Sequence, residues 1–210
     1  MPDRPDNRSP LALSTAPPAQ RHNHDGETVP FMVTECQQWP WHPAPVPSAL
    51  PIRQVWGWLF VPDGRCAVLL DTTYWLPLLP GGKIEQADGG DPTRCLIRET
   101  REEAQAALAD PCYLGYVYDA EGTVFGGGGP YARVRYAARV THIAAAAPDP
   151  AGRSLLRLLA PPRQAVELFG WGEQAHLQAE AAERIACDRW GLRLTPGAKV
   201  EEIPRQGMAW

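Results

Sequence analysis

Three glutamates and an arginine stand at spacings that place them on one side of a helix. Glu99, Glu102 and Glu103 occupy positions i, i+3 and i+4, so at about 100° per residue the three carboxylates share one arc of the helix surface. Like charges this close repel one another. A divalent cation would turn that repulsion into binding, because Mg²⁺ prefers carboxylate, water and phosphate oxygens. An ordinary solvated helix face would show the same pattern, so the neighbouring segments have to decide between the two.

The helix that carries these residues is expected to begin at Asp91-Pro92, since Asp is a favoured N-cap and Pro is favoured at the first helical position. It is expected to run to about Ala109, where Asp110-Pro111 ends it. Arg98 precedes Glu102 by one turn and could hold that side chain in place. The predicted buried stripe consists of Leu96, Ile97, Thr100, Ala104, Ala107 and Leu108.

A glycine pair lies upstream of this helix, in the segment Leu79-Pro80-Gly81-Gly82-Lys83-Ile84-Glu85. Glycine has no side chain, so the backbone there can approach an ion or a ligand closely. A loop of this kind feeding a helix of this kind is a much more specific signal than either part alone.

Together these segments resemble the Nudix box, a divergent version of which extends here from Gly82 to Ala106. The family pattern is Gly-x5-Glu-x7-Arg-Glu-U-x-Glu-Glu-x-Gly-U, in which U is a bulky aliphatic residue. The matching residues are Gly82, Arg98, Glu99, Glu102 and Glu103.

The first glutamate of the box has no direct counterpart. Counting back from Arg98 puts Gly90 at its position, and the spacing from Gly82 is two residues too long. Asp88 or Asp91 could replace the missing carboxylate.

Three further positions depart from the pattern near the end of the box. Thr100 replaces the aliphatic residue, Gln105 replaces the glycine after the last glutamate, and Ala106 is a small substitute for the final aliphatic residue. Without that glycine, the helix is expected to continue rather than to turn.

The resemblance implies an α/β fold, a Nudix-like α/β/α sandwich with a mixed sheet. It also implies a pyrophosphatase, a Mg²⁺- or Mn²⁺-dependent hydrolase of a nucleoside diphosphate linked to another group, such as a dinucleotide, ADP-ribose or a nucleotide sugar. By matched position Glu102 and Glu103 are the main metal ligands, Glu99 is a third ligand or the general base, and the carbonyl of Gly82 is a further ligand. Arg98 would orient a glutamate. The alternative is a Nudix-fold module that binds or senses such a nucleotide without hydrolysing it.

Arginines on a later strand are candidates for binding the substrate. The segment 131–141 alternates between an apolar face and a face that carries Arg133 and Arg135. Guanidinium groups could hold a diphosphate through forked hydrogen bonds. The other possibility is an ordinary solvated face.

The rest of the chain predicts a mixed layered domain preceded by an arm. Residues 1–50 are rich in proline and are expected to be either a disordered arm or a docking segment that pairs with this or a second subunit. Residues 51–210 form the Nudix-like domain with C-terminal helices. The expected strands are 54–61, 65–71, 112–119, 131–141 and 154–159, and the expected later helices are 161–169 and 173–190.

Composition excludes several other classes of protein. The net charge of −4 does not favour a nucleic-acid-binding domain, and no apolar stretch approaches the ~18 residues of a membrane span. Five cysteines without a C-x-x-C pair, and a polar start unlike a signal peptide, predict a cytoplasmic protein with reduced thiols. A composition rich in Ala, Arg and Pro suggests a bacterial source. The expected partner is a small-molecule nucleotide, with a homodimer possible.

Overall fold

The computed structural model describes residues 21–22, 28–29, 39–120, 122 and 129–210. The chain divides into two compact units, Met1–Val33 and Thr34–Trp210. In the first unit, the described residues are two short antiparallel strands, β1 (Arg21–His22) and β2 (Thr28–Val29). Most of the predicted arm therefore lies outside the described residues. The second unit contains all the elements discussed below.

The elements of the second unit follow the predicted order. Its strands are β3 (Trp41–His42), β4 (Ile52–Phe60), β5 (Cys66–Asp71), β6 (Leu76–Leu78), β7 (Gly81–Lys83), β8 (Ala106–Asp119), β9 (Tyr131–Ile143), β10 (Leu155–Ala160), β11 (Glu201–Glu202) and β12 (Met208–Ala209). Its helical segments are the 3-10 turn η1 (Gln86–Asp88), α2 (Pro92–Glu99), the π-helical turn η2 (Thr100–Ala104), α3 (Pro162–Phe169) and α4 (Gly172–Trp190).

The strands form one mixed sheet in the order β11-β10-β5-β4-β9-β8-β3, with β7 added beside β4, β6 beside β5 and β12 beside β9. The central pair, β4 and β9, is parallel, and the other described pairings are antiparallel. Trp41 and His42, from the end of the predicted arm, pair with β8 of the same chain. β4 positions the candidate site, because it pairs with both β7, which contains the glycine pair, and β9, which contains Arg133 and Arg135.

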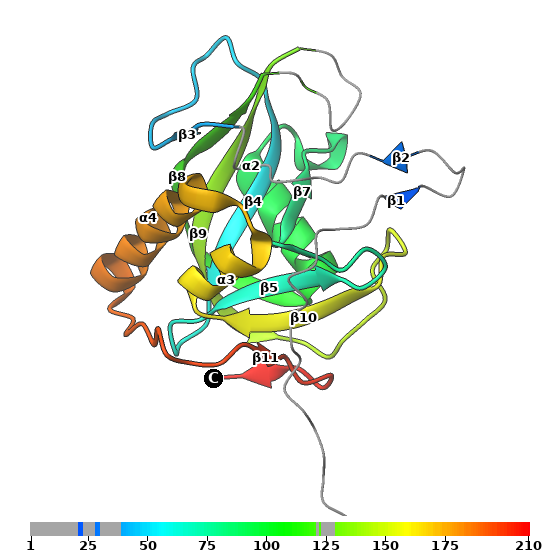
Figure 1. Ribbon diagram of the computed structural model, residues 1–210, viewed down its shortest axis with the longest axis vertical. Coiled ribbons are helices and arrows are strands. Elements are labelled where there is room, and N and C mark those ends of the chain that lie inside the picture. Colours follow the sequence, from blue (N-terminus) through cyan, green and yellow to red (C-terminus); the bar gives the residue numbers. More distant parts are fainter. Residues whose placement is uncertain (1–20, 23–27, 30–38, 121, 123–128) are drawn as a thin grey trace, which may run out of the picture. The chain divides into compact units, whose positions relative to one another are not determined.

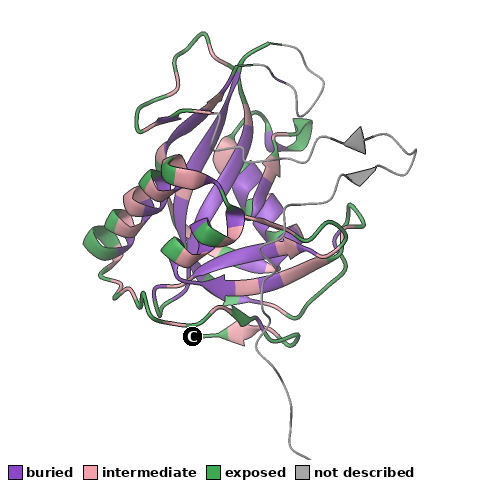
Figure 2. Ribbon diagram, in the orientation of Figure 1, coloured by how far each residue is buried: buried purple, intermediate pink, exposed green. Residues whose placement is uncertain are grey.

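Helices cover both faces of the sheet (Figure 1). Side chains of β4 alternate between two cores: Trp56 and Trp58 pack with α3 and α4, and Val55 and Leu59 pack with Leu96 of α2. Figure 2 shows the resulting buried layers along the strands and the exposed outer side of α4. The predicted α/β/α sandwich with a mixed sheet is confirmed.

The helix is shorter than predicted. α2 passes into the single turn η2, and the chain reverses at Gln105, which adopts the left-handed conformation with φ 52°. The side-chain amide of Gln105 donates to the carbonyl oxygen of Glu102 (2.8 Å) and so satisfies one of the last carbonyls of the turn. The predicted continuation to Ala109 is wrong, because residues from Ala106 onward pair with β9 instead.

The buried side of this helix also differs from the predicted stripe. Thr100 and Leu96 are buried as expected, but Ile97 is 36% exposed. Glu99 and Glu103 are 7% and 1% exposed. The helix therefore turns part of its acidic side toward the sheet, and the solvated-face interpretation is wrong for these two glutamates.

The left-handed conformation of Gln105 makes a prediction about stability. Gln105→Gly should be tolerated, whereas Gln105→Val should be less stable than Gln105→Gly by about 1–2 kcal/mol, because a β-branched residue fits a positive φ poorly. Urea unfolding of both variants measures the difference. If the helix continued through residue 105, Gly would be the worse residue, so a Gly variant less stable than the Val variant would contradict this geometry.

Candidate active site

The glycine pair is fixed by close contacts on both sides. Gly81 and Gly82 pair with Trp56 and Val55 of β4. A Cβ atom on Gly81 would lie 2.2 Å from the carbonyl oxygen of Val55, and one on Gly82 would lie 2.3 Å from Oε1 of Glu99. No side chain fits at either position, so the backbone of β7 lies directly against the acidic helix.

Glu103 is the most enclosed of the three glutamates, with a side chain that is 0% exposed. One carboxylate oxygen accepts from the backbone N–H of Gly81 at 2.9 Å, and the other accepts from the guanidinium of Arg153. Burial raises the pKa of Glu103 to about 7, although Arg153 and the Gly81 N–H favour the charged form. A cation that reached this buried carboxylate would stabilise its charged form.

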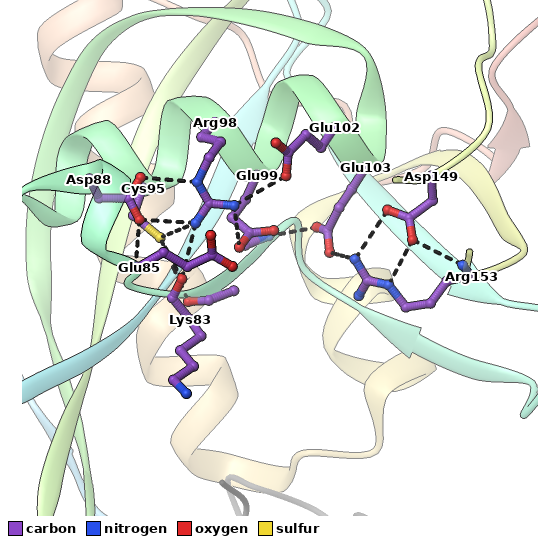
Figure 3. Close-up of polar contacts among 12 residues, drawn as sticks. Lys83, Glu85, Asp88, Cys95, Arg98, Glu99, Glu102, Glu103, Asp149 and Arg153 are labelled. Atoms are coloured by element: carbon purple, nitrogen blue, oxygen red, sulfur yellow. Dashed lines mark hydrogen bonds and ion pairs between the residues drawn. The ribbon is translucent and has the colours of Figure 1, made fainter. Parts of the chain in front are cut away.

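Arg98 connects the other two glutamates to the loop before the helix (Figure 3). Its Nη1 lies 3.0 Å from Oε1 of Glu99 and 3.1 Å from Oε2 of Glu102. Its Nη2 donates to the carbonyl oxygen of Lys83 at 3.1 Å. Burial raises the pKa of Glu99, and the charge of Arg98 opposes that rise. Arg98 therefore sets the orientation of both glutamates.

Asp88, in the turn before the helix, is a buried carboxylate that pairs with Arg98. Nε and Nη2 of Arg98 donate to its two oxygens at 3.0 and 2.9 Å, and the Asp88 side chain is only 3% exposed. Hydrogen bonds from Arg98 lower the pKa of Asp88 to about 2. Asp91, the other candidate, instead caps α2 by accepting from the N–H of Thr93 at 2.8 Å. Of the two aspartates left open by the sequence, Asp88 is the one that pairs with Arg98.

A different count along the sequence would have identified Asp88. Counting forward from Gly82, the pattern Gly-x5 leads directly to Asp88. The two extra residues then fall at Gly89 and Gly90, which take φ values of 63° and 79°. The glycines therefore form a turn between Asp88 and the helix.

The acidic side chains fit a divalent cation by their chemistry. Among the described residues, no group of three His, Cys, Asp or Glu is already placed to hold a metal ion. Mg²⁺, however, commonly takes one or two protein carboxylates and completes its shell with water and substrate phosphates. Glu99 and Glu103 are two buried oxygen donors at the glycine pair, and Glu102 is 34% exposed beside them.

A pocket of about 210 Å³ opens next to Glu103, and its wall includes Gln105, Asp149, Arg153 and Arg157. Asp149 accepts from Nε of Arg153 at 3.1 Å. Sequence reasoning missed Asp149 and Arg153, because they lie about 50 residues beyond Glu103 and only sheet pairing brings them there. The one available signal is the Asp-x3-Arg spacing, which is common.

The arginines predicted to bind substrate lie on the other side of the sheet, and both are fully buried. Arg133 pairs with Asp119 at 2.7 Å, and Arg135 donates to Gln178 of α4 at 3.0 Å. The alternative of a solvated face is therefore wrong. The guanidinium of Arg135 lies 5.2 Å from the ring of Trp56, which in turn lies against Gly81. The arginines and the acidic helix therefore lie on opposite faces of the sheet, with β4 between them.

The fold of this chain is similar to that of solved structures. The α/β/α sandwich is Nudix-like: a protein from Listeria monocytogenes assigned to the Nudix hydrolases superposes with a TM-score of 0.50 at 16% identity, over 68% of this chain and 99% of that one. No protein-family model and no curated protein sequence matches the chain.

Two further solved structures resemble the chain less closely. The Bacillus subtilis pyrophosphohydrolase BsRppH matches at 19% identity and a TM-score of 0.44, over 56% of this chain and 70% of that one. The C. elegans Ap4A hydrolase matches at 14% identity and a TM-score of 0.42, over 63% of this chain and 98% of that one.

The Asp88–Arg98 pair predicts how stability depends on pH. The folded-state pKa of Asp88 lies below the ordinary value, so its contribution is complete above pH ~4 and is lost as pH falls toward 2. Asp88→Asn should lower the free energy of unfolding by about 2 kcal/mol at pH 7, and much less at pH 2. Asp91→Asn is the matched control, because Asn also caps helices. Equal losses for Asp88→Asn at both pH values would contradict the ion pair.

Proposed function

We propose that this protein is a divalent-metal-dependent pyrophosphatase, a hydrolase that cleaves a phosphoanhydride bond in a nucleoside diphosphate linked to another group. Dinucleotides, ADP-ribose and nucleotide sugars are the substrate types to test. The observation that carries the proposal is the pair of buried carboxylates, Glu99 and Glu103, held against Gly81 and Gly82 on a Nudix-like fold.

The chain's own residues provide the ligands. Glu103, Glu102 and Glu99 would bind Mg²⁺ or Mn²⁺, and the Gly82 carbonyl is a further candidate ligand. When bound, the metal would neutralise diphosphate charge and activate a water molecule. Arg98 acts through the glutamates, because its guanidinium holds Glu99 and Glu102. Glu99 is either a ligand or the general base, and its burial gives it a raised pKa suited to accepting a proton.

Arg133 and Arg135 are proposed to bind the diphosphate or the attached group. The support for this role is the charge and forked geometry of the two guanidinium groups; because both are buried and pair with Asp119 and Gln178, a diphosphate would have to displace those contacts. The side-chain nitrogen and oxygen of Gln54, next to Arg133 in the sheet, are buried without a hydrogen-bond partner among the described residues. A polar ligand would satisfy such groups.

A nucleotide-binding module without turnover is the second candidate. The observation in its favour is that Arg153 already pairs with one oxygen of Glu103, so a metal would have to displace Arg153 or share that oxygen. Release of phosphate from a panel of nucleotides, with Mg²⁺ and with Mn²⁺, separates the two. Binding without release supports the module.

We further propose that the protein acts in the bacterial cytoplasm, with a homodimer as the assembly to test by light scattering. The four cysteines of the described region, Cys66, Cys95, Cys112 and Cys187, are free thiols, which is consistent with a reducing compartment. In the same region, no helix is long and apolar enough to cross a membrane.

Loss of a metal-binding carboxylate should abolish turnover. Glu102→Gln and Glu103→Gln should each lower kcat/KM by about 100-fold or more, because the amide removes the ligand charge. Glu167→Gln, an exposed glutamate on α3, is the control. Activity of either site variant near the wild-type level, or activity that persists in excess chelator, would contradict the proposal.

Loss of an arginine that binds the substrate should raise KM. Arg135→Ala should raise KM by about tenfold, as expected for one charge-assisted phosphate contact, with a smaller effect for Arg135→Lys. Arg163→Ala, on the exposed side of α3, is the control. Thermal melting confirms that each variant is folded. An unchanged KM in a folded Arg135→Ala variant rejects the role.

A further inference from the structure

Arg153 holds a position that a metal ion would need. Both oxygens of Glu103 are occupied: one by the backbone N–H of Gly81, the other by the Arg153 guanidinium. A cation can bind the Glu103 carboxylate directly only if one of these two donors gives way or shares its oxygen.

The two donors differ in their freedom to move. Gly81 belongs to β7, and a Cβ there would collide with the backbone of β4, so its N–H is fixed in place. Arg153 reaches Glu103 with a long side chain that is 36% exposed, from the segment before β10, and it lines a pocket into which it can turn. Arg153 is therefore the donor that a cation would displace.

A second contact keeps the displaced guanidinium near the site. Asp149 is buried and accepts from both the backbone N–H and Nε of Arg153, at 3.0 and 3.1 Å. Nη2 of Arg153 contacts both Glu103 and, at 3.3 Å, the other oxygen of Asp149, so the guanidinium is shared between the two carboxylates. Rotation of the guanidinium away from Glu103 would leave a positive charge at the pocket beside the acidic side chains.

We propose that Arg153 is an exchangeable counter-ion, which neutralises Glu103 in the metal-free protein and moves onto the diphosphate of the substrate when a divalent cation takes its place. The second half of this inference rests on the proposed function. The first half concerns metal binding alone, and it can be tested without turnover.

The first experiment is a Mn²⁺ titration followed by calorimetry and by electron paramagnetic resonance, with no nucleotide present. The wild type and all variants are titrated in the same buffer at one alkaline pH, because removal of Arg153 takes away a cation that favours the charged form of Glu103. Arg153→Ala should bind Mn²⁺ roughly fivefold more tightly than the wild type, because no internal cation has to leave. Arg153→Lys should stay near the wild type.

The control is Arg65→Ala. Arg65 also pairs with a nearby aspartate and a distant glutamate, Asp63 and Glu201, but these lie outside the site. Its Mn²⁺ affinity should match that of the wild type. Unchanged or weaker Mn²⁺ binding by folded Arg153→Ala, with melting as the check on folding, would overturn the exchange. If that variant does not fold, wild-type affinity in Arg153→Lys supports the exchange and tighter binding overturns it.

The second experiment uses imidodiphosphate, a non-hydrolysable diphosphate, in the presence of saturating Mn²⁺. Arg153→Ala should bind it roughly fivefold more weakly than the wild type, with partial recovery in Arg153→Lys. Equal affinity would reject the transfer of Arg153 to the diphosphate. Mn²⁺ binding that tightens in Arg153→Ala while no nucleotide is hydrolysed would leave the counter-ion exchange standing and reject the proposed function.

Discussion

Burial of carboxylates at a helix–strand contact is the constraint on which the rest of the site depends. Glu99 and Glu103 lie against a backbone that has no side chains to separate them from it. Buried charges are costly unless other charges or hydrogen bonds face them. Arg98 and Arg153 provide the opposing charges, each from a different segment of the chain. The site is therefore an alternation of acids and guanidinium groups rather than an acidic cluster alone.

The sheet brings these segments together. β4 is paired with β7 on one side and with β9 on the other, so the glycine pair and the buried arginines share one central strand. The acidic helix packs on one face, and Arg133 and Arg135 point to the other. Gly81 lies against Trp56 of the neighbouring strand, which leaves no room there for a side chain.

Local sequence patterns were sufficient to predict the order of the helices and strands and the residues that the acidic helix carries. The cap at Asp91, the alternation in 131–141 and the spacing of the glutamates all depend on near neighbours, and each predicted element is present. The end of the helix could not be predicted in this way, because Gln105 takes a conformation that usually favours glycine and is held there by pairing of the next strand.

Long-range contacts explain what the sequence did not reveal. Asp88 matches the box only when the count runs forward from Gly82, and its role is visible only in its pairing with Arg98. Arg153 and Asp149 reach Glu103 through the pairing of β10 with β5, which no local spacing encodes. The burial of Glu99 and Glu103 could not be predicted from the helical pattern, which places both on the acidic side of the helix beside the apolar stripe.

The proposed exchange of an internal guanidinium for a divalent cation at buried Glu103 can be observed in a crystal. Anomalous diffraction from crystals soaked in Mn²⁺ and imidodiphosphate tests this most directly. The expected result is a manganese peak in direct contact with Glu103, with Arg153 turned toward the diphosphate. A manganese ion bound elsewhere, with Arg153 still on Glu103, would contradict it.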